Sequence, residues 1–202
     1  MIDFFYQTLW ALDATLRVAT PLMLCAMAGI FSERSGIVDI SLEGKLLSGA
    51  FVAATIASLT GSVWLGLIGA ISASVLMSLL HGFACITHRG DQVVSGVAIN
   101  FLASGLTVIL GIAIFKRGGQ TPTLSSGERF RPIELWFVDA LDNVPVIGAI
   151  YRELISGHSL LVYVALLCVP IASFILYKSR FGLRLRAVGE SPIAVDSAGV
   201  SV

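Results

Sequence analysis

Polar side chains recur along one face of an otherwise apolar segment, about Val93–Phe115. Gln92 and Asn100 are two steps of four residues apart, and a four-residue step keeps positions on nearly one side of a helix. An amide in an apolar setting must find hydrogen-bond partners, so Asn100 should face other helices or a wet cavity. Two interpretations stay open. The face either bonds neighbouring helices or borders a solute path formed by Gln92, Ser95 and Asn100.

A second polar group occupies residues 32–45, between two apolar runs. It holds five charges, yet its centre, Ile37-Val38-Asp39-Ile40, is apolar with a single acid. Gly36 and Gly44 flank this centre, which predicts non-helical backbone that dips into the protein, as segments lining a cavity do. Asp39 and Glu43 would then border the solute path. The alternative is a surface loop whose charges are solvated.

Enzyme chemistry has little support in the sequence. The motifs H-E-x-x-H and G-x-S-x-G and the P-loop do not occur. His81 falls inside an apolar segment, where an ionisable group can be functional, and a neutral histidine bonded to a neighbouring helix is the alternative. The three cysteines are far apart without a C-x-x-C. We predict no catalytic residue, metal or cofactor.

Membrane-spanning helices must position these residues. Leu46 to Leu80 carry no charge and no histidine. At about 1.5 Å per residue and about 30 Å of hydrocarbon, this run suits two crossings that break at Thr60-Gly61-Ser62. The sequence therefore predicts an all-α polytopic bundle of about five spans. The expected spans are Leu16–Phe31, extended by earlier residues or preceded by an interfacial stretch, then Leu42–Thr60, Val63–Ile86, Val93–Phe115 and Leu160–Tyr177.

Composition agrees with one transmembrane domain over residues 1–202. Hydrophobic residues make up 56% and charged residues 13%, against about 25% charged in soluble domains. The net charge of zero gives no sign of nucleic-acid binding. Residues 116–157 read as an extracytoplasmic loop. Basic residues in 32–45, 87–91 and 178–186 place these regions in the cytoplasm and the N-terminus outside.

Small residues repeat at steps of four on the second and third spans, which predicts close helix packing within the membrane. They are Gly49, Ala53, Ala57 and Gly61, and then Gly66, Ala70, Ser74, Ser78 and Gly82.

A short capped helix is expected near the end of the chain, over residues 192–198. Ser191 is a good N-cap, Pro192 suits the first helical position, and Gly199 suits the residue after a helix. It follows the basic stretch 178–186 and so lies in the cytoplasm. A short helix of this kind is suited to docking a partner.

Three stretches, in this order, resemble the permeases of ABC transporters for nucleosides and simple sugars. They are Phe31-Ser32-Glu33-Arg34-Ser35-Gly36-Ile37-Val38-Asp39-Ile40-Ser41-Leu42-Glu43-Gly44, then Asp91-Gln92-Val93-Val94-Ser95-Gly96-Val97-Ala98-Ile99-Asn100 with Gly119-Gln120-Thr121-Pro122, and Phe181-Gly182-Leu183-Arg184-Leu185-Arg186-Ala187-Val188-Gly189-Glu190 through Ala198-Gly199. Two departures are Asp39, commonly Asn in that family, and Ser41, usually Gly.

The resemblance implies a multi-pass subunit of a binding-protein-dependent importer in the cytoplasmic (inner) membrane, surrounded by lipid. Its implied partners are an ATP-binding subunit that hydrolyses ATP, a second permease subunit and an extracytoplasmic solute-binding protein. Residues 181–202 would form the cytoplasmic coupling segment. The coupling residues are expected to be Gly189, Glu190, Pro192, Ala194, Asp196 and Gly199.

Relatives of this kind continue into further spans, so we expect the chain to be truncated at its C-terminus. The alternative function is an ion-coupled secondary transporter or a channel subunit, which needs no docking helix at 192–198.

Overall fold

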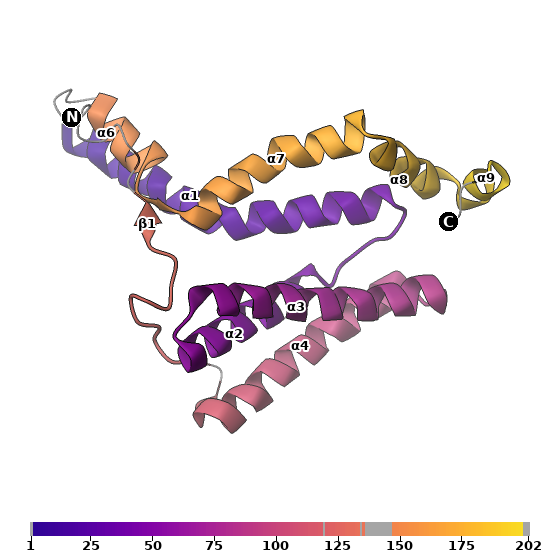
Figure 1. Ribbon diagram of the computed structural model, residues 1–202, viewed down its shortest axis with the longest axis horizontal. Coiled ribbons are helices and arrows are strands. Elements are labelled where there is room, and N and C mark those ends of the chain that lie inside the picture. Colours follow the sequence, from indigo (N-terminus) through magenta and orange to yellow (C-terminus); the bar gives the residue numbers. More distant parts are fainter. Residues whose placement is uncertain (1, 119, 134, 136–146, 200–202) are drawn as a thin grey trace. The chain divides into compact units, whose positions relative to one another are not determined.

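The computed structural model describes residues 2–118, 120–133, 135 and 147–199, and Figure 1 gives the order of the elements along the chain. Five helices are long and apolar enough to cross a membrane, which confirms the predicted helical class. The helices are α1 (Ile2–Arg34), α2 (Leu42–Thr60), α3 (Val63–Gly82), the π-helix η1 (Phe83–Thr87), α4 (Gln92–Phe115), α6 (Ile147–Ile150), the π-helix η2 (Tyr151–Ile155), α7 (Leu160–Lys178), α8 (Arg180–Glu190) and α9 (Pro192–Ser197).

The structure divides into two compact units, Met1–Met27 with Phe130–Ile175 and Ala28–Arg129 with Leu176–Val202. In the first unit, strand β1 (Pro132–Ile133) pairs antiparallel with β2 (His158–Ser159). The buried His158 ring lies with Nε2 3.4 Å from Asp13 Oδ1, on α1. The predicted extracytoplasmic loop at 116–157 contains β1, α6 and η2 and includes residues 136–146, which lie outside the described residues. Its side of the membrane, and a single domain over 1–202, stay predictions.

Earlier residues extend the first span beyond Leu16–Phe31, which is one of the two alternatives that the sequence left open. Helix α1 begins at Ile2, and its apolar span covers Phe4–Arg34. Arg17 does not end the helix, because its guanidinium pairs with Asp13 one turn earlier at 2.8 Å. An ion pair at this spacing supports a helix rather than interrupting it.

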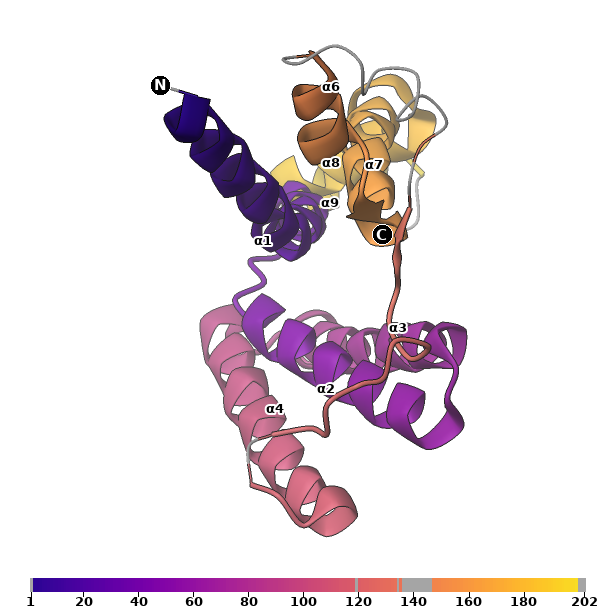
Figure 2. The ribbon, with the colours of Figure 1, turned by 90° about the vertical axis from the view of Figure 1, so that its left-hand side faces the viewer.

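In the second unit, α2 packs against both α3 and α4, as Figures 1 and 2 show. Part of the predicted small-residue stripes lies in the α2–α3 contact, whereas Gly61 and Gly82 at their ends do not. A Cβ added at Gly66 would lie 2.8 Å from the Ala53 carbonyl oxygen, and one at Gly49 would lie 2.7 Å from Ser74 Oγ. Only glycine lets the backbones approach so closely, which is how membrane helices pack without a hydrophobic drive.

The ends of the second-unit helices follow local chemistry. The predicted break at Gly61 is confirmed, since this glycine ends α2 with φ of 69° and donates its N–H to the Ala57 carbonyl. Asp91 caps α4 by accepting from the N–H groups of Val93 and Val94. Lys116 reverses the chain after α4 with φ of 56°, a conformation uncommon outside glycine.

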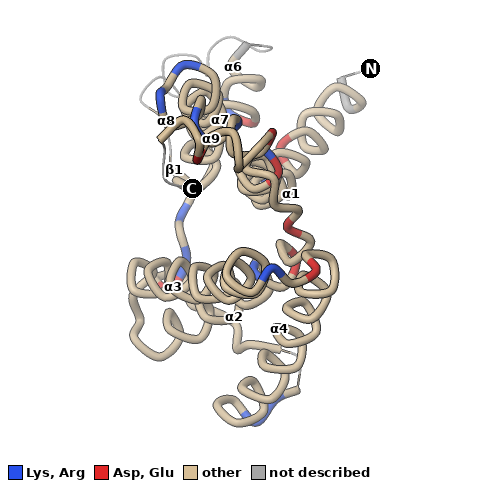
Figure 3. The backbone as a smooth tube through the Cα atoms, turned by 90° about the vertical axis from the view of Figure 1, so that its right-hand side faces the viewer, with Lys and Arg blue, Asp and Glu red and all other residues tan. Residues whose placement is uncertain are grey.

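The predicted helix 192–198 is confirmed as α9. Ser191 Oγ accepts from Ala194 N at 3.4 Å, Pro192 opens the helix, and Gly199 has φ of 78°. Ser191 also follows the last residue of α8, so it separates two helices. Lys and Arg gather along α8 and are missing from the middle of α3 and α4, as Figure 3 shows.

Candidate functional site

The polar face of α4 lies against the non-helical segment that joins α1 to α2. At the start of α4, Gln92 Oε1 accepts from Val38 N at 2.7 Å, and its Nε2 donates to the Gly36 carbonyl at 3.5 Å. The side chain therefore replaces part of the backbone pairing that residues 36–38 lack as non-helical chain. This contact favours the first of the two predictions for 32–45, a segment that enters the protein.

Asn100 holds the other end of the same segment. Its Oδ1 accepts from Gly44 N at 2.8 Å, and its Nδ2 donates to the Ile40 carbonyl at 3.1 Å. A Cβ added at Gly44 would lie 2.9 Å from Asn100 Cα, and one at Gly96 would lie 3.0 Å from Ile40 Cβ. Two glycines thus let α4 and the segment meet closely enough for one amide to bond both sides.

A buried cluster of charged and polar side chains lies beside this clasp. The Asp39 carboxylate accepts from Lys45 Nζ and from the N–H and hydroxyl of Ser41. Ser41 is fully buried, and the charged groups of Asp39 and Lys45 are only 9% and 10% exposed. Buried charges of this kind persist when they are paired and hydrogen-bonded. The charges at the centre of the segment are therefore not solvated.

His81 connects this cluster to α3 and α4. Its Nε2 lies 3.8 Å from Asp39 Oδ1, and its Nδ1 lies 3.1 Å from Ser95 Oγ. Cys85, one turn further on, places its sulfur 3.7 Å from Nδ1. Of the two predictions for His81, the bonded histidine has direct geometric support, since the ring is 3% exposed and has partners on neighbouring elements.

The electrostatics of Asp39 follow from this cluster, which lies between the two candidate spans. Burial favours the neutral acid, but hydrogen bonds from Lys45 and Ser41 and the charges of Lys45 and His81 favour the carboxylate. The second set outweighs the first, so the pKa of Asp39 lies below its ordinary value of 3.8.

The structure brings four of the five predicted path residues together: Gln92 and Asn100 bond the segment that contains Asp39, and Ser95 reaches it through His81. Glu43 is exposed in the first turn of α2, where an acid suits the positive end of the helix. Sequence reasoning missed Lys45 as the partner of Asp39. The signal that could have found it is the position of Lys45 at the start of the long uncharged run, where a lysine needs a nearby acid.

The predicted coupling segment touches the other end of segment 36–44. A Cβ added at Gly189, in the last turn of α8, would overlap the Arg34 carbonyl oxygen and lie 3.1 Å from Gly36 N. Gly36 itself has φ of 85° and a Cβ there would lie 3.3 Å from Gly189 Cα. The remaining predicted coupling residues are exposed beyond this contact: Glu190, Pro192, Ala194, Asp196 and Gly199.

This arrangement can bind and position backbone and side-chain groups through hydrogen bonds and ion pairs. Among the described residues there is no group of three His, Cys, Asp or Glu that could hold a metal ion. Five helices long and apolar enough to cross a membrane define the class as a polytopic membrane protein.

The chain belongs to the family described as branched-chain amino acid transport system / permease component, whose model matches residues 11–202. It is 41% identical to the guanosine ABC transporter permease protein NupQ of Bacillus subtilis, over 94% of this chain and 58% of that protein. It is 38% identical to the nucleoside ABC transporter permease protein NupC of Lactococcus lactis, over 91% and 57%. A putative glucose ABC transporter permease protein, TsgC13 of Haloferax volcanii, is 33% identical over 95% and 55%.

These matches confirm the resemblance drawn from the sequence and the multi-pass location in the cytoplasmic membrane. The chain spans less than two thirds of the length of these curated relatives. No solved structure matches it.

Proposed function

We propose that this chain serves in the membrane-spanning permease subunit of an ATP-driven importer for nucleosides or related simple sugars. The carrying observation is 41% identity to a guanosine permease along 94% of the chain. ATP is hydrolysed on a separate ATP-binding subunit. A second permease subunit and an extracytoplasmic solute-binding protein complete the transporter.

Nucleosides are the proposed substrate class. The family description names branched-chain amino acids, whereas relatives at 41% and 38% identity are named for guanosine and for nucleosides. The relative named for glucose is less similar, at 33%. We give more weight to the more similar relatives because substrate contacts depend on individual side chains, and a family description covers members whose side chains differ.

The ATP-binding subunit docks on α9. Ile193 is 81% exposed on this helix, and its neighbours Pro192 and Ala194 are exposed as well. An exposed apolar side chain on a short capped helix outside the spans suits insertion into a cleft of a partner. Asp196 and Glu190 add a polar rim of the kind that surrounds such contacts.

Movement of α9 reaches α4 through three contacts. Gly189 at the end of α8 lies in close backbone contact with Gly36. Gln92 forms hydrogen bonds with the backbone at residues 36 and 38, and Asn100 does so at residues 40 and 44. A segment fixed at both ends passes on a displacement that a floppy loop would absorb. Gln92, Ser95, Asn100, Asp39 and Glu43 then border the solute path through the shape they give this segment.

Uptake of radiolabelled guanosine tests the function in cells that express the protein from its own chromosomal locus. Deleting the gene should abolish uptake and restoring it should recover uptake. Excess unlabelled adenosine should compete, while leucine should not. Dissipating the proton gradient without lowering ATP should leave uptake intact, and loss of uptake under that condition would indicate an ion-coupled transporter instead.

Docking of the ATP-binding subunit is tested by Ala194→Trp and Glu190→Lys in the same gene. Both residues are exposed, so membrane insertion should be unchanged. We expect loss of the copurifying ATPase, or ATP hydrolysis without uptake. Normal copurification and transport in both variants would refute the assignment of α9.

A further inference from the structure

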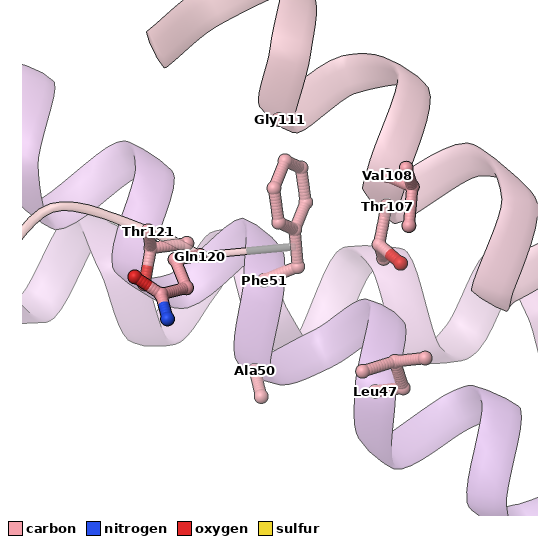
Figure 4. Close-up of a pocket in the computed structure, with 8 residues that line it drawn as sticks. All are labelled: Leu47, Ala50, Phe51, Thr107, Val108, Gly111, Gln120 and Thr121. Carbon is pink, nitrogen blue, oxygen red and sulfur yellow. The ribbon is translucent and has the colours of Figure 1, made fainter. Parts of the chain in front are cut away.

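A pocket of about 230 Å³ lies between α2, α4 and the chain that follows α4. We name it the α2–α4 pocket and define it by its lining residues. They are Leu47, Ala50 and Phe51 from α2, Thr107, Val108 and Gly111 from α4, and Gln120 and Thr121 from the returning chain. Figure 4 shows these side chains around the hollow.

The returning chain closes one side of this pocket. Lys116 turns the backbone in a left-handed conformation, and a Cβ added at Gly111 would lie 3.4 Å from the Arg117 carbonyl oxygen. The backbone after α4 therefore runs back along the helix. This return brings Gln120 and Thr121, part of the run that resembled the family, to the same hollow as Phe51.

The lining favours a neutral solute with a flat ring. Figure 4 shows the Phe51 ring between Gly111 and the Gln120 and Thr121 side chains, and a Cβ at Gly111 would lie 3.7 Å from Phe51 Cε2. Gly111 and Ala50, which carry no side chain larger than a methyl group, line the pocket together with this ring. An aromatic ring stacks on bases of any kind, because every base has a π face.

The polar groups of the lining further restrict which solutes the pocket can bind. The Gln120 amide offers a donor beside an acceptor, a pattern that matches the edge of a nucleobase. Thr107 and Thr121 add hydroxyl groups. No charged side chain lines this pocket among the described residues. A zwitterionic amino acid or a phosphorylated nucleotide would bring charges without partners, at a high cost in desolvation.

We propose that the α2–α4 pocket binds the base of a nucleoside, stacked on Phe51 and hydrogen-bonded by Gln120. The inference rests on the proposed function and deepens it by assigning a substrate contact within one permease subunit. Pockets that enclose a drug-sized ligand usually exceed about 300 Å³. The smaller volume here suits a single ring system, with the sugar left outside.

Kinetics of guanosine uptake in the chromosomally expressed transporter test the site. Phe51→Leu keeps an apolar side chain but removes the stacking face, and we expect its KM to rise about tenfold. Gln120→Met keeps the length but removes both hydrogen-bonding atoms, and its KM should rise as well. Phe101→Leu is the matched control, because it makes the same change at a phenylalanine of α4 that is 75% exposed and lies outside the pocket.

Photolabelling of the purified complex with 8-azidoguanosine gives a second measurement that does not depend on variants. The reactive azide is on the base, so the proposal predicts labelled peptides from residues 47–51 or 107–121. Unlabelled guanosine should protect these peptides, and leucine should not.

The outcomes separate the two proposals. If wild-type cells do not transport nucleosides, the proposed function fails and the pocket assignment fails with it. If they transport guanosine but Phe51→Leu and Phe101→Leu behave alike and the label falls elsewhere, only the pocket assignment is overturned. The latter result is also expected if a lipid chain or a partner subunit fills the pocket.

Discussion

Gly189→Ala is the sharpest test of the contact between the coupling segment and segment 36–44. The added Cβ would come closer to the Arg34 carbonyl oxygen than real Cβ atoms ever do, and it would lie 3.1 Å from Gly36 N. Both neighbours are backbone atoms, so no flexible side chain can turn away. Gly36 has φ of 85° and is itself restricted to glycine-like geometry.

The loss of stability expected for Gly189→Ala is estimated from the cost of overpacking, and a matched control variant separates it from the change in helix propensity. Forcing a methyl group into a filled space costs about 1–3 kcal/mol. Alanine also favours a helix over glycine by about 1 kcal/mol. Gly105→Ala in α4 gains a similar amount of helix propensity, but a Cβ there meets nothing within 4 Å. The difference between the two variants therefore isolates the overlap, about 1–3 kcal/mol.

The assay uses the transporter purified with its ATP-binding subunit, first for thermal stability and then in proteoliposomes. Gly189→Ala should lower the unfolding temperature and the amount of guanosine taken up per ATP hydrolysed. Gly105→Ala should lower neither. Equal unfolding temperatures and equal transport ratios in the two variants would refute the contact and the coupling route built on it.

Three further predictions address the site and the topology. Asn100→Leu leaves Gly44 N–H and the Ile40 carbonyl without their partner, which costs about 1–3 kcal/mol of stability. It should abolish uptake without loss of assembly. Normal uptake would leave Asn100 a packing residue only. Cysteine placed at Ser62 should react from outside and at Ser179 from the cytoplasm, and reaction of both from one side would contradict the orientation. Asp39 has a lowered pKa, so its stabilising effect should be present above its ordinary value of 3.8 and lost as the pH falls through the lower folded value. The difference in unfolding temperature between wild type and Asp39→Asn should therefore shrink only in acid; a difference that shrinks near neutral pH would contradict the lowered pKa.

Features set by neighbouring residues were predictable from the sequence. The α2–α3 turn at Gly61, the capped α9 and the small-residue face of α3 each depend on local backbone or helical spacing. The start of the first helix was left open between an extended helix and an interfacial stretch, and the pairing of Arg17 with Asp13 accompanies the extended helix.

Contacts between distant stretches were not predictable in this way. The polarity of Asn100 indicated that it needed partners, but its bonds to residues 40 and 44 require α4 to lie beside a segment nearly 60 residues away. The contact of Gly189 with Gly36 depends on tertiary approach in the same sense. Nothing in the sequence predicted that the chain turns back at Lys116, since lysine rarely adopts the left-handed conformation found there.

The distribution of contacts around segment 36–44 decides which helix a displacement would move. The ion pair between Asp39 and Lys45 stays within the segment and the first turns of α2, so it strengthens the segment without tying it to another helix. The link from Asp39 to His81 on α3 is long, at 3.8 Å. The bonds from Gln92 and Asn100 on α4 are shorter, with distances of 2.7 and 2.8 Å to backbone N–H groups.

A push on Gly36 should accordingly reach α4 before α3. Breaking the route at its entrance with Gly189→Ala, or at its exit with Asn100→Leu, should then give one shared phenotype, continued ATP hydrolysis with little uptake. Two variants more than 80 residues apart in the sequence would share that phenotype only if the segment between them carries the movement. If Gly189→Ala uncouples the transporter while Asn100→Leu loses only substrate affinity, the route ends at the segment and Asn100 acts on the solute instead.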